Sequence, residues 1–424
     1  MAKLEIQIHT RKMLKPSTPT PDHLRSLKLS LFDQLAPRLY VPVLFHYLPS
    51  SEGIITERCD KLQNSLAETL TKFYPLAGRF REDELSIHCN DEGVEYVETK
   101  VNADLAEFLH QGPNNIEVLD DLLPTDMPSS PLLGIQVNIF NCGGLVMGIK
   151  ISHVLADGFT LGTFIKEWAR ISQTGTTKGC LPTFGRLPVL FPSRVLSGPY
   201  ISPSSNRDPE IVTRRFVFDA LAVAKLKERI NSSAMFTSPT RVVVVMSLIW
   251  KVLAGISSAK HGYSRDSYFL FPVNLRGKSN LPSVEHDLGN FCVVGVAALE
   301  ANQSRKELTD FVNVVGSTAR ETSIEIGKAS IDDIASMFLT CKTPQKEEMD
   351  IYFCTSWCKF PWYEADFGWG NPFWVSDVSK PAELITLIDT KSGDGIEAWI
   401  GLKENDMAEF ERDPDILTFC PPQN

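Results

Sequence analysis

The residues most able to do chemistry are a histidine and an aspartate four positions apart, in Ser152-His153-Val-Leu-Ala-Asp157-Gly158. His153 follows a predicted buried strand at 148–151 and precedes a predicted helix at 159–171. Side chains at strand ends in α/β proteins face the region where functional sites gather, and an imidazole can act as a general base near neutral pH. The spacing also fits a structural role, in which Asp157 caps the helix and His153 is a hydrogen-bonded core residue.

Two later segments also combine polar groups with tight turns. Tyr363-Glu-Ala-Asp366-Phe-Gly-Trp-Gly-Asn-Pro372 places glycines around Trp369, which predicts an aromatic turn that is either a packed loop or part of a site. Phe271-Pro-Val-Asn274-Leu-Arg276-Gly-Lys278 reads as a strand end followed by two cations. Its alternative reading is a solvated strand terminus.

Several common chemistries are excluded by their missing motifs. The chain has no G-x-S-x-G nucleophile elbow and no H-E-x-x-H zinc motif. Gly277-Lys278-Ser279 resembles the end of a phosphate-binding loop, but Pro272 stands where that loop requires glycine. Cys354 and Cys358 are four apart, which is not the zinc-ligand spacing, so we expect no metal site. The sequence therefore favours a mechanism in which a base activates the substrate's own nucleophile.

Composition narrows the class of protein further. The chain has 424 residues, of which 43% are hydrophobic and 22% charged, a composition typical of a globular protein. Its formal net charge of −10 argues against a nucleic-acid partner. No apolar run reaches 18 residues, so no membrane span is predicted. The nine cysteines are an odd number, and the first residues lack an apolar signal region. We therefore expect free thiols and a cytoplasmic protein.

The elements that must position these residues form two α/β halves. In the first half we predict a helix at 56–73, hairpins at 84–98 and 133–152, and the helix at 159–171. The second half includes a predicted helix at 239–253 and predicted strands at 268–273 and 349–355. Residues 192–209 contain four prolines and five serines, which is typical of an interdomain crossing. The predicted domains are therefore 1–191 and 210–424, with 192–209 as the linker.

In combination, these segments resemble the plant BAHD acyltransferases, which use acyl-CoA donors. The resemblance rests on His153-x-x-x-Asp157-Gly158, on Asp366-Phe-Gly-Trp-Gly370 near the C-terminus and on Phe73-Tyr-Pro-Leu-Ala-Gly-Arg79. Their order and separation agree with the family over the whole chain. The opening, Lys15 to Pro21 followed by Leu29-Ser-Leu-Phe-Asp33-Gln34, is most similar to the branch of the benzyl alcohol acetyltransferases and vinorine synthase.

The resemblance implies an α/β fold of two chloramphenicol-acetyltransferase-like domains, with mixed sheets flanked by helices and a long crossover loop. By resemblance, His153 is the general base, and the hydroxyl of Thr355 and the indole N–H of Trp357 stabilise the oxyanion. The family's aspartate that matches Asp157 forms a structural ion pair with an arginine, here Arg276.

Two further residues carry weaker implications from the family. Asp366 is either a second catalytic acid or a structural residue of its loop, and Lys278 is a candidate contact of a CoA phosphate. Acyl-CoA, with acetyl-CoA as the favoured donor, is expected as co-substrate, with no bound cofactor. The expected activity is esterification of a hydroxyl of a plant specialised metabolite such as an alkaloid, terpenoid or aromatic alcohol, by a monomer with no nucleic-acid or membrane partner. N-acylation of an amine and a non-catalytic family member are the alternatives.

Overall fold

The chain folds into two compact units. The computed structural model describes residues 4–111, 119–125, 127, 130–179, 182–194, 210–230, 239–277, 286–301, 307–330, 332–334, 336, 349–378 and 382–421. The first unit comprises Met1–Ser205, Val284–Phe291 and Phe360–Lys380, and the second comprises Asn206–Ser283, Cys292–Lys359 and Pro381–Asn424. Each unit contains a six-stranded mixed sheet, so the predicted two-domain α/β architecture is confirmed.

The sheet of the first unit has the strand order β1-β6-β7-β8-β3-β13. Only β6 and β7 run parallel; the other neighbours are antiparallel. Its strands are β1 (Ile6–Leu14), β3 (Tyr40–Tyr47), β6 (Val94–Val101), β7 (Leu133–Phe140), β8 (Leu145–Ser152) and β13 (Trp374–Ser376). Its helices are α1 (Leu31–Leu35), α2 (Glu52–Lys72), α3 (Leu105–Gln111), α5 (Gly158–Thr174) and α6 (Arg186–Leu190), with short 3-10 turns at Asp22–Leu24, Tyr74–Ala77 and Trp362–Glu364.

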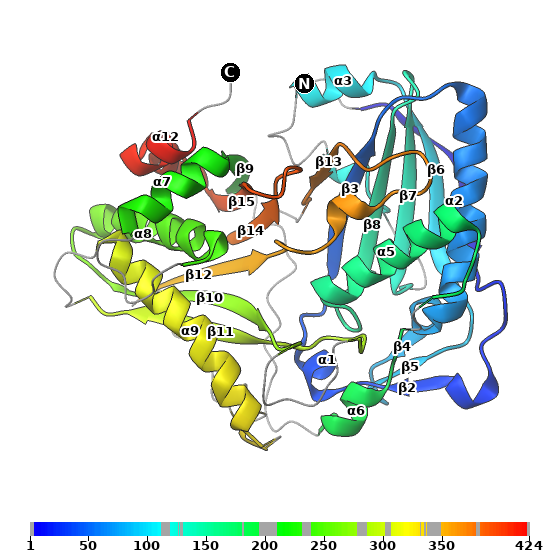
Figure 1. The fold of residues 1–424 in the computed structure, drawn as a ribbon, viewed down its shortest axis with the longest axis horizontal. Helices are drawn as coiled ribbons and strands as arrows, with labels where there is room; N and C mark the ends of the chain where they lie inside the picture. Colours follow the sequence, from blue (N-terminus) through cyan, green and yellow to red (C-terminus); the bar gives the residue numbers. More distant parts are fainter. Residues whose placement is uncertain are drawn as a thin grey trace. The chain divides into compact units, whose positions relative to one another are not determined.

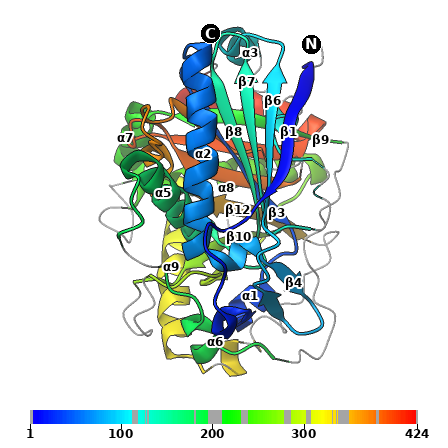
Figure 2. The same ribbon diagram turned by 90° about the vertical axis from the view of Figure 1, so that its right-hand side faces the viewer.

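Helices α2 and α5 lie side by side on one face of this sheet (Figures 1 and 2). The indole N–H of Trp168 in α5 donates to the hydroxyl of Ser65 in α2 at 3.0 Å, and Trp168 is fully buried. Lys72 at the end of α2 forms a 2.7 Å ion pair with Glu167 of α5. The apolar stripes predicted at 56–73 and 159–171 therefore do form helices, and both pack toward the core of the unit.

The hairpin predicted at 133–152 is confirmed as β7–β8, but the one predicted at 84–98 is wrong. The second segment of that prediction is β6, which pairs with β1 and β7. The first is β5 (Ser86–His88), which pairs with β2 (Ser26–Lys28) and β4 (Arg79–Arg81) in a separate three-stranded sheet. Alternation of apolar residues identifies strands but does not choose their partners.

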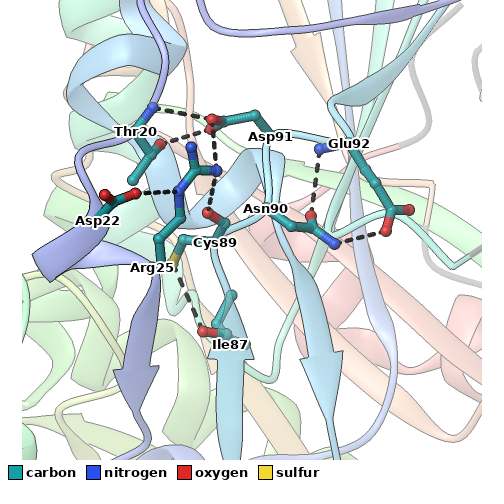
Figure 3. A network of polar contacts seen from close by, with 8 residues as sticks. All are labelled: Thr20, Asp22, Arg25, Ile87, Cys89, Asn90, Asp91 and Glu92. Atoms are coloured by element: carbon teal, nitrogen blue, oxygen red, sulfur yellow. Dashed lines mark hydrogen bonds and ion pairs between the residues drawn. The ribbon is translucent and has the colours of Figure 1, made fainter.

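The segment between β5 and β6 carries a polar network instead of a two-strand turn (Figure 3). Asp91, whose φ is +57°, accepts hydrogen bonds from the backbone N–H and the hydroxyl of Thr20 at 2.9 and 2.6 Å. It also forms a 3.0 Å ion pair with Arg25, whose guanidinium donates to the carbonyl of Cys89. This network joins the N-terminal segment that leads into β2 and α1 to the end of β5.

The sheet of the second unit has the order β11-β10-β12-β14-β15-β9, with β12 parallel to both β10 and β14. Its strands are β9 (Ile211–Phe218), β10 (Asp266–Asn274), β11 (Cys292–Leu299), β12 (Met349–Ser356), β14 (Leu384–Asp389) and β15 (Ile396–Lys403). Its helices are α7 (Ala220–Ile230), α8 (Arg241–His261), α9 (Leu308–Lys328), α11 (Glu404–Arg412) and α12 (Pro414–Phe419). Helices α7, α8 and α9 cover one face of the sheet (Figure 1).

Helix α8 is the apolar centre of the second unit. The ring of Trp250 stacks on Phe269 of β10 at 5.4 Å and meets Phe311 of α9 edge-on at 5.0 Å. By length and composition alone, α8 is the one described helix that could cross a membrane. Much of it is buried against the sheet and α9, which is how a core helix also passes such a test.

The predicted domain boundaries need one correction. Residues 284–291 and 360–380, expected in the C-terminal domain 210–424, belong to the first unit. The reason is that β13 completes the edge of the first sheet, with Trp374 opposite His46 and Ser376 opposite Leu44. The Asp366–Gly370 string is therefore carried by the first unit. Of the predicted linker 192–209, only 192–194 lie within the described residues.

Candidate active site

His153 directly follows β8. Ser152, the last residue of that strand, pairs with Tyr40 of β3, and the backbone N–H of His153 extends the pairing by donating to the carbonyl of Leu39 at 2.8 Å. The carbonyl of His153 accepts a 2.8 Å hydrogen bond from the side-chain amide of Asn290. The main chain of His153 is therefore held from two sides. The residue as a whole is partly exposed, whereas Nδ1 of its imidazole is buried with no hydrogen-bond partner in the part of the chain that the structure describes.

Asp157 is the N-cap of α5. Its Oδ1 accepts from the backbone N–H of Thr160 at 2.9 Å, and its Oδ2 accepts from the backbone N–H of Phe291 at 3.1 Å. Only 8% of the residue is exposed. A carboxylate at a helix N-terminus satisfies otherwise unpaired N–H groups and interacts favourably with the helix dipole. Both oxygens of Asp157 thus stabilise backbone structure.

The segment 286–291 is bound into the first unit at several points around His153. The hydroxyl of Thr160 donates to the carbonyl of Gly289 at 2.9 Å and accepts from its N–H at 3.1 Å. Gly289 has φ +129°, a conformation that a residue with a Cβ rarely adopts. The side chain of Asp287 accepts from the N–H of Leu187 at 2.7 Å. These contacts bring Asn290 against the carbonyl of His153.

Asp33 completes this part of the site from a third segment. It is the third residue of α1 and forms a capping box with Ser30. Its other oxygen accepts from both the backbone N–H and the side-chain amide of Asn290, at 2.7 and 2.9 Å. Burial raises the pKa of this carboxyl, and the hydrogen bonds from Asn290 and Ser30 act in the opposite direction.

Asp366 is engaged within its own turn. Its Oδ1 accepts from the N–H groups of Gly368 and Gly370 at 2.8 and 2.9 Å, and its Oδ2 accepts from the side-chain amide of Gln173 at 3.2 Å. Both glycines have positive φ, +105° and +102°, which explains why glycine occupies these positions. The carboxylate therefore stabilises a turn that depends on glycine at both positions.

The aromatic residues of the same loop pack into the first unit. Trp369 stacks on Phe367 at 5.7 Å and lies edge-on to Tyr47 at 6.2 Å. The guanidinium of Arg58 lies over the Trp369 ring at 5.2 Å, within the range of a cation–π contact. The hydroxyl of Tyr47 donates to the carbonyl of Ala365 at 2.8 Å. These contacts support the packed-loop reading of the segment.

Thr355 and Trp357 belong to the second unit. Thr355 is in β12 opposite Thr386 of β14. The backbone N–H of Trp357 continues this pairing by donating to the carbonyl of Leu387 at 2.7 Å. Trp357 is 7% exposed. The β14 pairing holds the backbone of both residues. Their predicted role, stabilisation of the oxyanion beside His153, would involve residues of both units and stays a prediction.

Arg276 also lies in the second unit, just after β10. Its backbone N–H donates to the side chain of Asn274 at 3.0 Å, and the following Gly277 has φ +72°, so the strand ends in a tight turn. The expected pair between Arg276 and Asp157 spans the two units and stays a prediction. Lys278, the candidate for a CoA phosphate, lies outside the described residues.

Two residues near His153 were missed by the sequence analysis. Asn290 was not singled out at all, and Asp33 was noted only as part of a family resemblance. They are 257 positions apart, and neither lies in a motif with known chemistry. Only the capping-box pattern from Ser30 to Asp33 was available as a local signal. Their contact depends on the segment Val284–Phe291 belonging to the first unit, far from its neighbours in the sequence.

The chain is similar over nearly its whole length to known acyltransferases. A model of the Transferase family matches residues 4–417. The acetyl-CoA-benzylalcohol acetyltransferase of Clarkia breweri is 35% identical over 437 residues, covering 98% of this chain and 100% of that protein. Vinorine synthase of Rauvolfia serpentina is 32% identical, with 94% of each chain covered.

Solved structures extend the same likeness to the fold. A crystal structure of vinorine synthase has a TM-score of 0.84 at 30% identity and covers 98% of each chain. One of F. sporotrichioides TRI101, complexed with coenzyme A and T-2, has a TM-score of 0.73 at 16% identity, covers 93% of this chain and 98% of that chain, and shows the shared fold alone.

The family model and the relatives named as acetyltransferases identify an acyltransferase, and the structure shows it as two α/β units. The chain belongs to the Transferase family, that of the plant BAHD acyl-CoA-dependent acyltransferases. The family resemblance drawn from His153-x-x-x-Asp157 and Asp366-Phe-Gly-Trp-Gly370 is confirmed, and so is the fold class.

Proposed function

We propose that the protein transfers an acyl group, most often acetyl, from acyl-CoA to a hydroxyl of a plant specialised metabolite, with His153 as general base. The observation that carries the assignment is the contrast within the motif. Both carboxylate oxygens of Asp157 accept backbone N–H groups, whereas His153, a partly exposed residue, is the remaining titratable residue of the motif. Relatives named as acetyltransferases of benzyl alcohol, limonoids and an alkaloid support the donor and the acceptor class.

In the proposed reaction, Nε2 of neutral His153 takes the proton of the acceptor hydroxyl as its oxygen attacks the thioester carbonyl. An unassisted alcohol is a poor nucleophile, and a general base typically contributes about 10²–10⁴ in rate. The carbonyl oxygen becomes an oxyanion, for which the Thr355 hydroxyl and the Trp357 indole N–H are the proposed donors. Collapse breaks the C–S bond, and the imidazolium returns the proton to the CoA thiolate, which leaves an ester and free CoA.

Two alternatives make different predictions. An amine acceptor depends less on a base, so an N-acyltransferase would lose less activity when His153 is removed. A non-catalytic binding protein would release no CoA with any acceptor. The presence of His153, Thr355 and Trp357 together favours the enzyme, because a binding role has no need for a base and two donors.

We also propose that the protein acts as a cytoplasmic monomer. The seven cysteines that the structure describes are all free, as expected in a reducing compartment. Light scattering during size-exclusion chromatography tests the oligomeric state. A mass of two or more chains would contradict the monomer.

The experiment that tests the function crosses a panel of acyl-CoA donors with alcohols and amines and measures release of the CoA thiol. We expect turnover with acetyl-CoA and at least one aromatic, alkaloid or terpenoid alcohol. The His153→Ala protein, assayed in parallel, distinguishes enzymatic transfer from hydrolysis of the thioester. Release only with amines would favour the first alternative, and no release above the His153→Ala background would contradict the proposed function.

A further inference from the structure

The carboxylate of Asp33 is buried, and each of its oxygens accepts two hydrogen bonds. Only 2% of Asp33 is exposed. Its Oδ2 accepts from the backbone N–H and the hydroxyl of Ser30, at 3.0 and 2.7 Å. Its Oδ1 accepts from the backbone N–H and the side-chain amide of Asn290, at 2.7 and 2.9 Å. Capping of α1 accounts for the hydrogen bonds to Oδ2, but it does not account for the hydrogen bonds that Oδ1 accepts from Asn290.

Asn290 connects that second oxygen to the candidate base. Its Nδ2 donates both to Oδ1 of Asp33 at 2.9 Å and to the carbonyl of His153 at 2.8 Å. An amide nitrogen has two N–H donors, so one group can serve both acceptors. Asn290 itself is 1% exposed. The residue therefore forms a buried bridge between α1 and the residue that follows β8.

The hydrogen bonds to Oδ1 of Asp33 fix the direction in which this amide points. A carboxylate accepts only, so it selects the nitrogen of Asn290 and turns the amide oxygen away. The nitrogen is then the atom available to the carbonyl of His153. Packing supports the same junction, because the neighbouring residues Phe32 and Phe291 meet edge-on at 5.2 Å.

We propose that Asp33 is a positioning residue for catalysis, which acts through Asn290 to hold the main chain of His153. The proposal rests on the function proposed above, in which His153 is the base. A general base must lie within hydrogen-bond reach of the proton that it removes, and a displacement of about 1 Å can cost about 10²-fold in rate. The bridge fixes the main-chain position from which the imidazole projects, and both of its residues are almost completely buried.

The first test removes the bridge with Asn290→Ala and compares it with Asn138→Ala. Asn138 is also fully buried in the first unit, and its Nδ2 donates to the carbonyl of Leu122 and to that of Val146, which lies at the far end of β8 from His153. Both variants strand carbonyl acceptors, so both should lower the melting temperature. We expect only Asn290→Ala to lower kcat, by up to about 10²-fold, with KM for acyl-CoA little changed. Equal kcat losses in the two variants would overturn the proposal.

A double-mutant comparison tests whether Asp33 acts through Asn290. The Asp33→Asn amide has one oxygen, so it can serve either the Ser30 donors or the Asn290 donors but not both. If the two residues act in series, the Asp33→Asn/Asn290→Ala protein should lose little more kcat than the worse single variant. Fully multiplicative losses would show independent effects and contradict the proposal.

A readout without turnover separates this proposal from the proposed function. In protein with ¹³Cε1-labelled histidine, the His153 signal is assigned by its loss in His153→Ala. We expect Asn290→Ala and Asp33→Asn to move or broaden that signal, and Asn138→Ala to leave it in place. An unmoved signal in an active enzyme would overturn the positioning role alone. A moved signal in a protein that transfers no acyl group would support the positioning and contradict the proposed function.

Discussion

Asp157 offers the sharpest test of structural against catalytic roles, because its two oxygens have separate partners. In Asp157→Asn the remaining oxygen can still cap the N–H of Thr160, since asparagine is about as good an N-cap as aspartate. The new amide nitrogen then faces the backbone N–H of Phe291, and because both groups are donors no hydrogen bond can form between them. Stranding that N–H costs about 1–3 kcal/mol. Asp157→Ala loses the cap as well, which adds about 1 kcal/mol.

Asp413 provides a matched control for this prediction. It is the N-cap of α12, but one oxygen, Oδ1, accepts from both Asp415 and Ile416. Asp413→Asn can keep both bonds and should melt near the wild type. Asp157→Asn should melt lower, by about 2–4 °C for each kcal/mol in a domain of this size.

The assay combines thermal unfolding with thiol release at a temperature where every variant is folded. We expect Asp157→Asn to lose stability and to keep more kcat than His153→Ala, since a cap acts on the reaction only through the backbone. The structural assignment would be refuted if Asp157→Asn melts like the wild type and yet transfers no acyl group.

Four further predictions follow from the described contacts. His153→Ala should keep its melting temperature and lose about 10²–10⁴ in kcat; more than a tenth of wild-type kcat would exclude it as the base. Asp366→Asn should stay active, because one oxygen can accept both glycine N–H groups of the turn, whereas Asp366→Ala should melt lower; an inactive, stable Asp366→Asn would indicate a catalytic acid. Burial raises the pKa of Glu167, but hydrogen bonds from Arg170 and Lys72 outweigh this effect and hold the pKa below its usual value. The ionised carboxylate therefore stabilises the fold above its unfolded pKa, and this contribution is lost as pH falls through the folded pKa. In urea titrations, the difference in unfolding free energy between wild type and Glu167→Gln should narrow toward pH 3, and a difference that widens in acid would contradict the ion pair. Initial-rate kinetics should give intersecting double-reciprocal lines, since no activated nucleophile motif is present, and an acyl adduct seen by intact mass after mixing with donor alone would contradict direct transfer.

Local pattern was sufficient for most of the elements that carry the site. The stripe at 159–171 became α5, and the glycine turn between two apolar runs became the β7–β8 hairpin. In both cases the signal and its structural consequence lie within a few residues. The pattern at 84–98 failed because its two strands belong to different sheets.

The candidate site was predictable in part for the same reason. His153 and Asp157 were identified from their spacing. That spacing was also compatible with Asp157 as a helix cap, and its hydrogen bond from Thr160 shows this capping role. The contact of Asp157 with Phe291 was not predictable, because it joins residues 134 positions apart. The roles of Thr355 and Trp357 rest on family resemblance and remain predictions.

The sequence by itself determined the family, the two α/β halves and the histidine that can act as a base, because motif spacing and hydrophobic periodicity are local properties of the chain. Only the tertiary structure decided that 286–291 and 360–380 belong to the first unit, and that Asn290 links the carboxylate of Asp33 to the carbonyl of His153. The physical reason is that a buried carboxylate or amide must find partners wherever the folded chain brings them. Burial and partner choice depend on all the elements together, and no window of the sequence contains them.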